Sequence, residues 1–457
     1  MSTQPSVDIG LLGRYDHPGP RYTSYPTAPQ FREDFDEQRL RRWAWCSNIQ
    51  VSPRPISLYV HIPYCFSPCF YCGCNRSITR DPARGEHYVA RLLQELRLIA
   101  PLFDSRRKVI QLHLGGGTPN FLSSTQLSQL FAGLDGSFRL SRAAERDFSI
   151  ELDPRHVHDG DIAMLVQLGF NRVSLGVQDF DARVQQAINR VQSVAETLAV
   201  IEASRRSGLR SVNIDLIYGL PLQTPAGFAS TLDTVIGARP ERVAVYGYAH
   251  MPALFRAQRQ IDTADLPGPE ARLTLLQLAV ERLGAGGYRY IGMDHFALPG
   301  DDLARAQEDG RLHRNFMGYT THAGCDLIGL GASAISHIGD SYSQNHREIS
   351  KWEAALAQDQ LPVARGLELG ADDLARADAI QQLMCRGEID IATLERHHGI
   401  EFRTYFAPAL QRLRPLIKDG LASADVTHIR ATPRGRLLLR VLAMCFDRYL
   451  PAEPPAA

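Results

Sequence analysis

Short apolar runs alternate with helical segments between about residues 55 and 250. The runs are rich in β-branched residues, as in buried strands, and lie at Ser57–Ile62, Val109–Leu114, Phe148–Leu152, Arg172–Val177, Val212–Tyr218 and Arg242–Tyr248. Between the first two runs, His87–Ala100 has apolar residues at the spacing of one helix face. Six strand–helix units in succession predict a parallel sheet with right-handed crossovers. Six units are two short of a closed eightfold barrel.

Capping signals support the helices of this region. Ser193-Val-Ala-Glu196 has the spacing of a capping box, and the helix that it starts is expected to end before Gly208. Thr224-Pro225 supplies an N-cap and an N1 proline for the next helix. Asn189-Arg190 is expected to lie in the helix that follows the fourth strand.

The pattern changes after residue 250. Residues 251–365 combine a predicted helix at Leu273–Leu283 with strands or loops at Ile291–Phe296 and Asp326–Ser336. Residues 366–450 are mainly helical, and their last part has the order helix, hairpin, helix, at Pro408–Lys418, Leu421–Ala431 and Gly435–Tyr449. This order is also that of a winged helix, a DNA-binding shape. Since basic residues are not in excess here, an accessory domain that covers the barrel is favoured.

These patterns divide the chain into four parts. Residues 1–54 form an N-terminal extension, 55–365 a barrel with its elaboration, and 366–450 the mainly helical accessory domain. Residues 451–457 are a tail of Pro, Ala and Glu that we expect to be disordered.

Composition and charge narrow the functional classes. The 457 residues include 50 basic and 50 acidic side chains, so the formal net charge is zero and no nucleic-acid or membrane-surface partner is indicated. No apolar run approaches the ~18 residues of a membrane span. The first residues have neither the basic nor the apolar region of a signal peptide, so we expect a cytoplasmic protein.

Four of the eight cysteines, at Cys65, Cys69, Cys72 and Cys74, fall within ten residues. The first three have the spacing C-x3-C-x2-C. Three thiolates can hold three irons of a [4Fe–4S] cube, which leaves the fourth iron open to a small molecule. A zinc site usually takes two separated C-x2-C pairs, and the chain has no second pair. A disulfide framework is typical of short secreted chains.

Polar residues and glycines follow the predicted strands. Leu114-Gly-Gly-Gly-Thr-Pro119 comes after the second strand, and its glycines let backbone groups approach a ligand closely. Glu151 points to the opposite face from Ile150 and Leu152, and a carboxylate there needs a partner, which is either a ligand or an arginine. The fourth strand ends at Gln178, the fifth carries Asp215, and the sixth ends at Tyr248-Ala249-His250. Because active residues of such barrels lie at the carboxyl ends of strands, these positions are expected to share one site.

The cysteine spacing resembles that of the radical S-adenosylmethionine (SAM) enzymes. Over nearly its whole length, the chain resembles one family of them, the oxygen-independent coproporphyrinogen III oxidases. The resemblance rests on the segments 19–27, 65–74, 115–119, 176–180, 213–221 and 313–319. It implies an α/β fold with an open, three-quarter (β6α6) barrel, an N-terminal extension and a mainly helical C-terminal domain.

The resemblance also implies the cofactor sites. The [4Fe–4S] ligands correspond to Cys65, Cys69 and Cys72, and Cys74 belongs to the motif without being an iron ligand. A first SAM site corresponds to Tyr59, Gly116, Glu151 and Ile335. A second SAM site, distinctive of the family, corresponds to Tyr71, Gly117, Thr118, Gln178, Arg190, Asp215 and Ala249.

The function implied is the oxidative decarboxylation of two propionates of coproporphyrinogen III to vinyl groups. The product is protoporphyrinogen IX, an intermediate of haem biosynthesis, and the reaction proceeds through 5′-deoxyadenosyl radicals from SAM. It needs a low-potential electron donor and an electron acceptor, which the sequence does not identify. Nothing in the sequence requires more than a monomer.

The substrate carries four carboxylates, so arginines should line its pocket. Arg21 and Arg314 lie inside shared motifs and are the candidates, with solvated surface arginine as the alternative for each. The N-terminal segment is expected to lie over the mouth of the site. Two rival functions are a haem chaperone and a radical SAM methylase. Related chaperones have an aromatic residue in place of Cys74 and lack the run Arg21–Thr27, so the oxidase is favoured.

Overall fold

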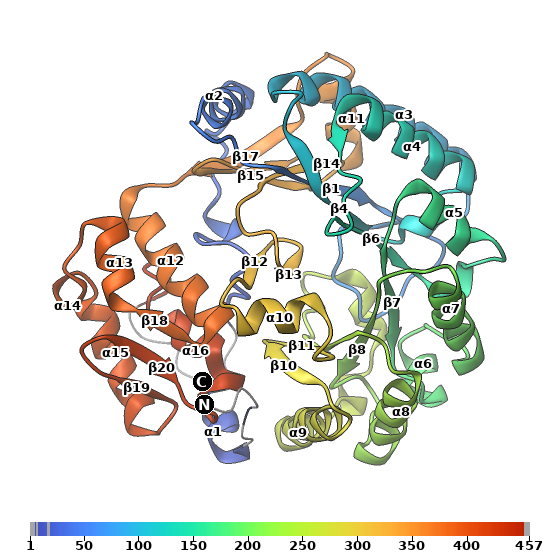
Figure 1. The fold of residues 1–457 in the computed structure, drawn as a ribbon. Coiled ribbons are helices and arrows are strands. Elements are labelled where there is room, and N and C mark those ends of the chain that lie inside the picture. The colour runs from blue at the N-terminus through green and yellow to red at the C-terminus, as the bar shows by residue number, and fades with distance from the viewer. Residues whose placement is uncertain (1–4, 6–7, 16–18, 452–457) are drawn as a thin grey trace.

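The fold is described from a computed structural model of the chain, for all residues except 1–4, 6–7, 16–18 and 452–457. Its main sheet curves into a partial barrel, with helices around the outside (Figure 1). Parallel strands run in the spatial order β14, β1, β4, β6, β7, β8, β9. Their bounds are β1 Ile56–Ile62, β4 Lys108–Gly116, β6 Asp147–Leu152, β7 Arg172–Gln178, β8 Ser211–Tyr218, β9 Arg242–Gly247 and β14 Asp326–Leu330.

All six predicted strands are confirmed, and β14 joins them by pairing Asp326 with Ile56. Antiparallel strands extend the sheet at both ends. They are β15 Ile335–Ile338, β16 Ser341–Asn345 and β17 Val363–Glu368 beyond β14, and β11 His295–Ala297 and β10 Arg289–Gly292 beyond β9. The predicted strand at Ile291–Phe296 is therefore a hairpin, which turns at Met293 with a left-handed φ of 51°.

All but one of the outer helices named here pack on the sheet through one apolar core, the exception being α6, whose Val184 lies in a separate small cluster. They are α3 Pro82–Ile99, α4 Ser124–Ser137, α5 Asp161–Leu168, α6 Ala182–Ala187, α7 Val194–Arg206, α8 Pro225–Ala238, α9 Pro269–Ala285 and α11 Ile349–Leu356. The capping box of Ser193 and Glu196 is confirmed, and Thr224 Oγ1 accepts a hydrogen bond from Gly227 N at 3.1 Å. Asn189 and Arg190 lie beyond α6, contrary to the prediction, because Asn189 takes a left-handed φ of 54° that ends the helical path.

A second apolar core forms on the open side of the barrel. It lies among α12 Ala371–Arg386, α13 Ile391–His398, α14 Phe402–Tyr405, α15 Ala407–Lys418, α16 Leu439–Met444 and a sheet of β18 Glu388–Asp390, β20 His428–Ala431 and β19 Ala422–Ala424. Tyr22, Tyr25 and α1 Ile9–Tyr15 contribute to the same core, so the N-terminal part packs against the C-terminal part.

The last predicted helix is shorter than expected. A 3₁₀ turn at Gly435–Leu438 precedes α16, which ends at Met444 rather than Tyr449. The chain turns there because Phe446 is buried and Arg412 donates a hydrogen bond to the carbonyl of Cys445 at 2.9 Å. The predicted helix at Pro408–Lys418 and the hairpin at Leu421–Ala431 are confirmed.

Smaller elements lie between the two cores (Figure 1). They are α10 Asp302–Glu308 and the hairpin of β12 His313–Asn315 and β13 Gly318–Thr320, with α2 Glu37–Asn48 against the sheet edge. No helix of the described residues is long and apolar enough to cross a membrane. Apart from Pro451, the predicted disordered tail lies outside the described residues.

Candidate active site

The clustered cysteines follow the carboxyl end of β1. The loop is held by a short parallel pairing of β2 Tyr64–Cys65 with β3 Ser77–Ile78. Cys65 and Cys69 are buried, and all four cysteines line one cavity of about 300 Å³. The cavity is shared with Tyr71, Gly116, Gly117, Thr118, Glu151, Gln178, Arg190 and Asp215. The structure thus brings the cysteine loop together with most of the predicted cofactor residues.

Each of the first three sulfur atoms faces a hydrogen-bond donor. Thr118 Oγ1 lies 3.4 Å from Cys65 Sγ, Arg190 Nη1 lies 3.6 Å from Cys69 Sγ, and Cys74 N lies 3.4 Å from Cys72 Sγ. Such donors stabilise thiolates, the form that binds iron. Hydrogen bonds from Cys74 lower the pKa of Cys72, whereas burial raises the pKa of Cys65 to about 11.

Three cysteine thiolates that line one cavity fit a [4Fe–4S] cluster. Among the described residues, no group of three His, Cys, Asp or Glu side chains could hold one metal ion. In a [4Fe–4S] cluster each thiolate binds a different iron, so its ligands need not converge on one point.

The glycine loop lies directly against the cysteine loop. Gly117 N donates to the carbonyl of Ile62 at 2.8 Å, and Thr118 N donates to the carbonyl of Tyr64 at 2.9 Å. A Cβ atom at Gly117 would lie 2.8 Å from the Tyr64 oxygen, and Gly116 has a left-handed φ of 116°. Side chains at these two positions would push the loops apart, which explains why glycine is needed.

Glu151 is held by two donors that sequence reasoning did not name. His113 Nε2 lies 3.1 Å from its Oε1, and Gly116 N donates to Oε2 at 3.2 Å. Burial alone would raise the pKa of Glu151, but these contacts lower it below its ordinary value. The suggested arginine partner is therefore wrong. His113 lies on the inward face of β4. In the sequence, its role could have been suspected only because it is a polar residue inside an apolar strand.

His113 is itself fixed from two sides. Its Nδ1 lies 2.8 Å from Ser149 Oγ, and its ring stacks on Tyr59 at 5.9 Å with an interplanar angle of 17°. Tyr59 pairs with Gly329, and a Cβ atom at Gly329 would lie 2.6 Å from the Ile335 carbonyl oxygen. Tyr59 and Ile335 are thus neighbours beside the cavity, although neither lines it.

Arg190 is buried beneath the cysteine loop. Its Nη2 donates to the carbonyl of Gly176 at 2.6 Å, and its Nη1 lies 3.2 Å from Asp153 Oδ2. Among the described residues, its buried Nε has no hydrogen-bond partner. Asp153 was not singled out from the sequence. Burial opposes its ionisation, but the hydrogen bond from Arg155 and the charge of Arg190 lower its pKa to about 2. Asp153 is therefore the ionised partner that orients Arg190.

Of the remaining predicted residues, Asp215 lines the cavity and Ala249 does not. Asp215 accepts hydrogen bonds from Ser174 Oγ and Asn213 Nδ2, both at 2.9 Å, and burial together with the charge of Glu151 raises its pKa to about 6. Gln258 Nε2 donates to the carbonyls of Tyr71 at 2.9 Å and Ala249 at 3.1 Å. Gln258, in a 3₁₀ turn with no recognisable motif, thereby ties together two predicted SAM contacts.

Both arginines predicted to bind substrate contact other residues, but the buried Nη1 of Arg314 has no hydrogen-bond partner among the described residues. Arg21 forms an ion pair with Asp294 and lies 5.3 Å from the centre of the Tyr246 ring, which lines the cofactor cavity. Arg314 is only 2% exposed, so it is not a solvated surface residue. Its guanidinium lies 4.7 Å from the centre of the Tyr319 ring, and its Nε donates to the carbonyl of Arg21 at 3.1 Å.

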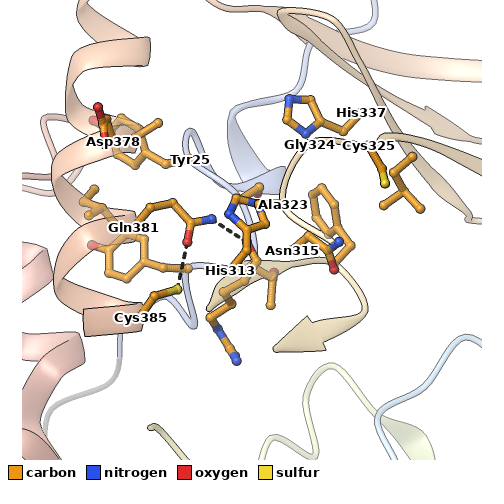
Figure 2. Close-up of a pocket in the computed structure, with 18 of the residues that line it drawn as sticks. Tyr25, His313, Asn315, Ala323, Gly324, Cys325, His337, Asp378, Gln381 and Cys385 are labelled. Atoms are coloured by element: carbon orange, nitrogen blue, oxygen red, sulfur yellow. Dashed lines mark hydrogen bonds between the residues drawn. The ribbon is translucent and has the colours of Figure 1, made fainter. Parts of the chain in front are cut away.

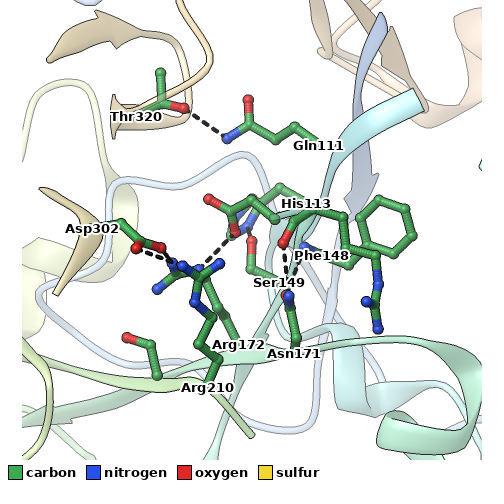
Figure 3. A network of polar contacts seen from close by, with 12 residues as sticks. Gln111, His113, Phe148, Ser149, Asn171, Arg172, Arg210, Asp302 and Thr320 are labelled. Carbon is green, nitrogen blue, oxygen red and sulfur yellow. Dashed lines mark hydrogen bonds and ion pairs between the residues drawn. The ribbon is translucent and has the colours of Figure 1, made fainter. Parts of the chain in front are cut away.

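A second polar cluster, the arginine network, occupies the amino ends of the same strands (Figure 3). Arg172 lies 3.2 Å from Asp147 Oδ1 and 3.5 Å from Asp301 Oδ2, and it forms a further ion pair with Asp302. Arg210 pairs with Asp302 at 2.5 Å. The network thus balances buried arginine charge with carboxylates.

Comparison with known proteins agrees with this geometry. Residues 59–235 match the Radical SAM superfamily, and residues 369–438 match the HemN C-terminal domain. The chain is 50% identical over 448 residues to the oxygen-independent coproporphyrinogen III oxidase of Pseudomonas aeruginosa, covering 97% of this chain and 96% of that protein. It is 46% identical over 443 residues to the Escherichia coli protein of the same name, covering 97% and 95% of the two chains.

A solved structure gives the same result. The coproporphyrinogen III oxidase (HemN) of Escherichia coli, described as a radical SAM enzyme, superposes with a TM-score of 0.93 at 45% identity, covering 98% of this chain and 100% of that one. With this coverage and identity, the chain belongs to the oxygen-independent coproporphyrinogen III oxidases, a family of radical SAM enzymes.

Proposed function

We propose that this chain converts two propionates of coproporphyrinogen III to vinyl groups without oxygen, which gives protoporphyrinogen IX. Each propionate loses CO2, one hydrogen atom and one electron. The observation that carries the proposal is the single cavity that joins Cys65, Cys69 and Cys72 to the glycine loop and Glu151. Family membership supplies the substrate class.

Cys65, Cys69 and Cys72 would hold a [4Fe–4S] cluster. One SAM molecule would lie against Tyr59, Gly116, Glu151 and Ile335, and a second against Tyr71, Gly117, Thr118, Gln178, Arg190, Asp215 and Ala249. When bound, these groups supply the one-electron chemistry that removes a hydrogen atom from a propionate side chain.

The residues of the chain position and neutralise these ligands. Glu151, kept ionised by His113 and Gly116 N, offers a carboxylate to the SAM ammonium or to a ribose hydroxyl. Arg190, oriented by Asp153, places a cation beside the sulfur of Cys69 and leaves Nε free for a ligand. Gln258 holds Tyr71 and Ala249 at a fixed spacing. Such positioning is the part of catalysis that the protein supplies.

The proposed domain roles follow the packing. The N-terminal extension of residues 1–54 would cover the mouth, since Arg21 stacks on Tyr246 at the cavity wall. Residues 55–365 would form the catalytic barrel, and residues 366–450 the accessory domain. We further propose a cytoplasmic monomer that uses a separate low-potential electron donor and an electron acceptor, with no nucleic-acid or membrane partner.

Anaerobic incubation with coproporphyrinogen III, SAM and dithionite tests the function. We expect protoporphyrinogen IX and 5′-deoxyadenosine to accumulate together, without methyl transfer from labelled SAM. Tight haem binding without either product would instead identify a haem chaperone and overturn the proposal.

A further inference from the structure

A second cavity, of about 550 Å³, lies where three parts of the chain meet (Figure 2). The β12–β13 hairpin places His313 and Asn315 in its wall, and α12 contributes Gln381 and Cys385. The N-terminal residues Tyr22–Tyr25 close a further side, and Arg54 and Cys325, at the amino ends of β1 and β14, line it together with His337 of β15. Its volume lies within the range of small-molecule sites.

Several polar groups of this wall have no partner in the protein. Among the described residues, no hydrogen bond or ion pair engages the guanidinium of Arg54 or the ring nitrogens of His313 and His337. The His337 ring only packs on Tyr342, at 4.4 Å between ring centres. Polar groups inside a protein are normally paired, so unpaired groups around one cavity point to a ligand.

The charges of the wall define the chemistry of that ligand. Asp378 is already in contact with His398 at 3.1 Å, and Asp340 lies outside ion-pair distance of Arg54 in the described part of the chain. Arg54 is therefore available for a carboxylate, which matches its planar fork. Burial lowers the pKa of both His313 and His337 to about 4, so at neutral pH each ring is uncharged and can accept an N–H hydrogen bond.

The position of the cavity connects it to the proposed SAM site. Ile335 and His337 lie two residues apart on β15, so their side chains share one face about 7 Å apart. Ile335 neighbours Tyr59 beside the cofactor cavity, whereas His337 faces the second cavity. A ligand that contacts His337 therefore reaches the strand that carries Ile335, one of the residues assigned to SAM.

We propose that this second cavity is the recognition pocket for the tetrapyrrole substrate, with Arg54 binding a propionate carboxylate and His313 and His337 accepting pyrrole N–H groups. The inference rests on the proposed function and deepens it. It adds Arg54, His313 and His337 to the substrate-binding candidates, and Arg314 lines the same cavity with a buried Nη1 that has no hydrogen-bond partner among the described residues. It also explains why the N-terminal extension, the hairpin and α12 meet at this place.

Fluorescence titration of the purified chain with coproporphyrin III, the stable oxidised form of the substrate, tests the pocket without turnover. We expect Arg54→Gln to weaken binding roughly tenfold or more, as for loss of a charge-assisted hydrogen bond. His313→Gln should weaken it less. Arg403→Gln, at an exposed position on α14, is the matched control and should bind like the unaltered chain. Equal affinity for coproporphyrin III in the unaltered chain and all three variants would overturn the proposal that this cavity binds the substrate.

The tetramethyl ester of coproporphyrin III provides a second test of the carboxylate contact. It should bind the unaltered chain more weakly than the free acid and should be insensitive to Arg54→Gln, whereas equal binding of ester and acid would contradict the carboxylate contact. Failure of the pocket and failure of the function remain distinguishable. If the chain makes protoporphyrinogen IX but binds coproporphyrin III equally well without Arg54, the proposed pocket is wrong and the proposed function still holds.

Discussion

The two ends of the barrel strands carry polar clusters of opposite character. At the amino ends, Arg172 faces three aspartates, so its charge is balanced within the protein. At the carboxyl ends, Arg190 has one carboxylate, Asp153, within ion-pair distance among the described residues, and Glu151 and Asp215 lie close enough for one to raise the pKa of the other. The first cluster is built for stability. The second leaves charge and hydrogen-bonding capacity for ligands.

The largest effect is expected at the cysteine loop. Cys72→Ala should abolish cluster binding and the formation of 5′-deoxyadenosine, because only two of the three thiolates remain. Iron and sulfide analysis after anaerobic reconstitution measures this directly. Cys46→Ala, on α2 and away from the cavity, should keep its iron; equal iron in the two variants would contradict the assignment.

A change in the arginine network should affect stability rather than chemistry. Arg172→Ala leaves the carboxylate of Asp147 without its ion-pair partner, whereas Asp301 keeps Arg242 and Asp302 keeps Arg210, and it should lower the free energy of unfolding by about 3–5 kcal/mol. Arg210→Ala, whose side chain is 38% exposed, should lower it by about 0–1 kcal/mol. Urea unfolding measures the free energy of unfolding of both variants. Similar losses in the two would contradict the claim that the buried arginine of the network stabilises the fold more than the exposed one.

The carboxylates of the cofactor cavity predict a pH effect of intermediate size. Asp215 has a pKa of about 6, above the value of 3.8 for a free carboxyl. Its stabilising contribution is therefore complete below pH 3.8 and is lost as the pH rises through 6. Asp215→Asn should gain stability relative to the unaltered chain between pH 4 and 7, by up to about 3 kcal/mol. Thermal unfolding over this range checks the sign, and parallel curves for the two proteins would contradict it.

Removal of one charge from the cavity should have the smallest effect. Glu151→Gln keeps the shape but loses the carboxylate, and it should weaken SAM binding to the reconstituted protein by about tenfold. Equilibrium dialysis with labelled SAM measures the affinity. Glu202→Gln, on the exposed face of α7, is the control. Unchanged affinity in Glu151→Gln would place SAM elsewhere.

Local signals in the sequence were sufficient for most of the fold. The six parallel strands, the cap at Ser193 and the hairpin at Leu421–Ala431 depend on neighbouring residues, and all were predicted. The pairing of Ile56 with Asp326 was not, because it joins residues 270 positions apart and no periodicity records such a contact. The early end of α16 depends in the same way on a distant arginine, Arg412.

The candidate site was predictable where a motif existed. The cysteines and the glycine loop have distinctive spacings, and the structure brings them together. His113, Asp153 and Gln258 act through other residues and are common polar side chains, so only the folded geometry identifies them. Arg314 lies in a recognisable motif, and the structure places it in the wall of the second cavity, where its buried Nη1 has no hydrogen-bond partner among the described residues, so its role in substrate binding stays a prediction.

The most direct test of the account is the electron paramagnetic resonance spectrum of the reduced, reconstituted protein with and without SAM. We predict a clear change in the cluster signal on addition of SAM, because the iron without a cysteine ligand would bind it. A signal that stays the same at saturating SAM would contradict a cluster with an open iron at Cys65, Cys69 and Cys72.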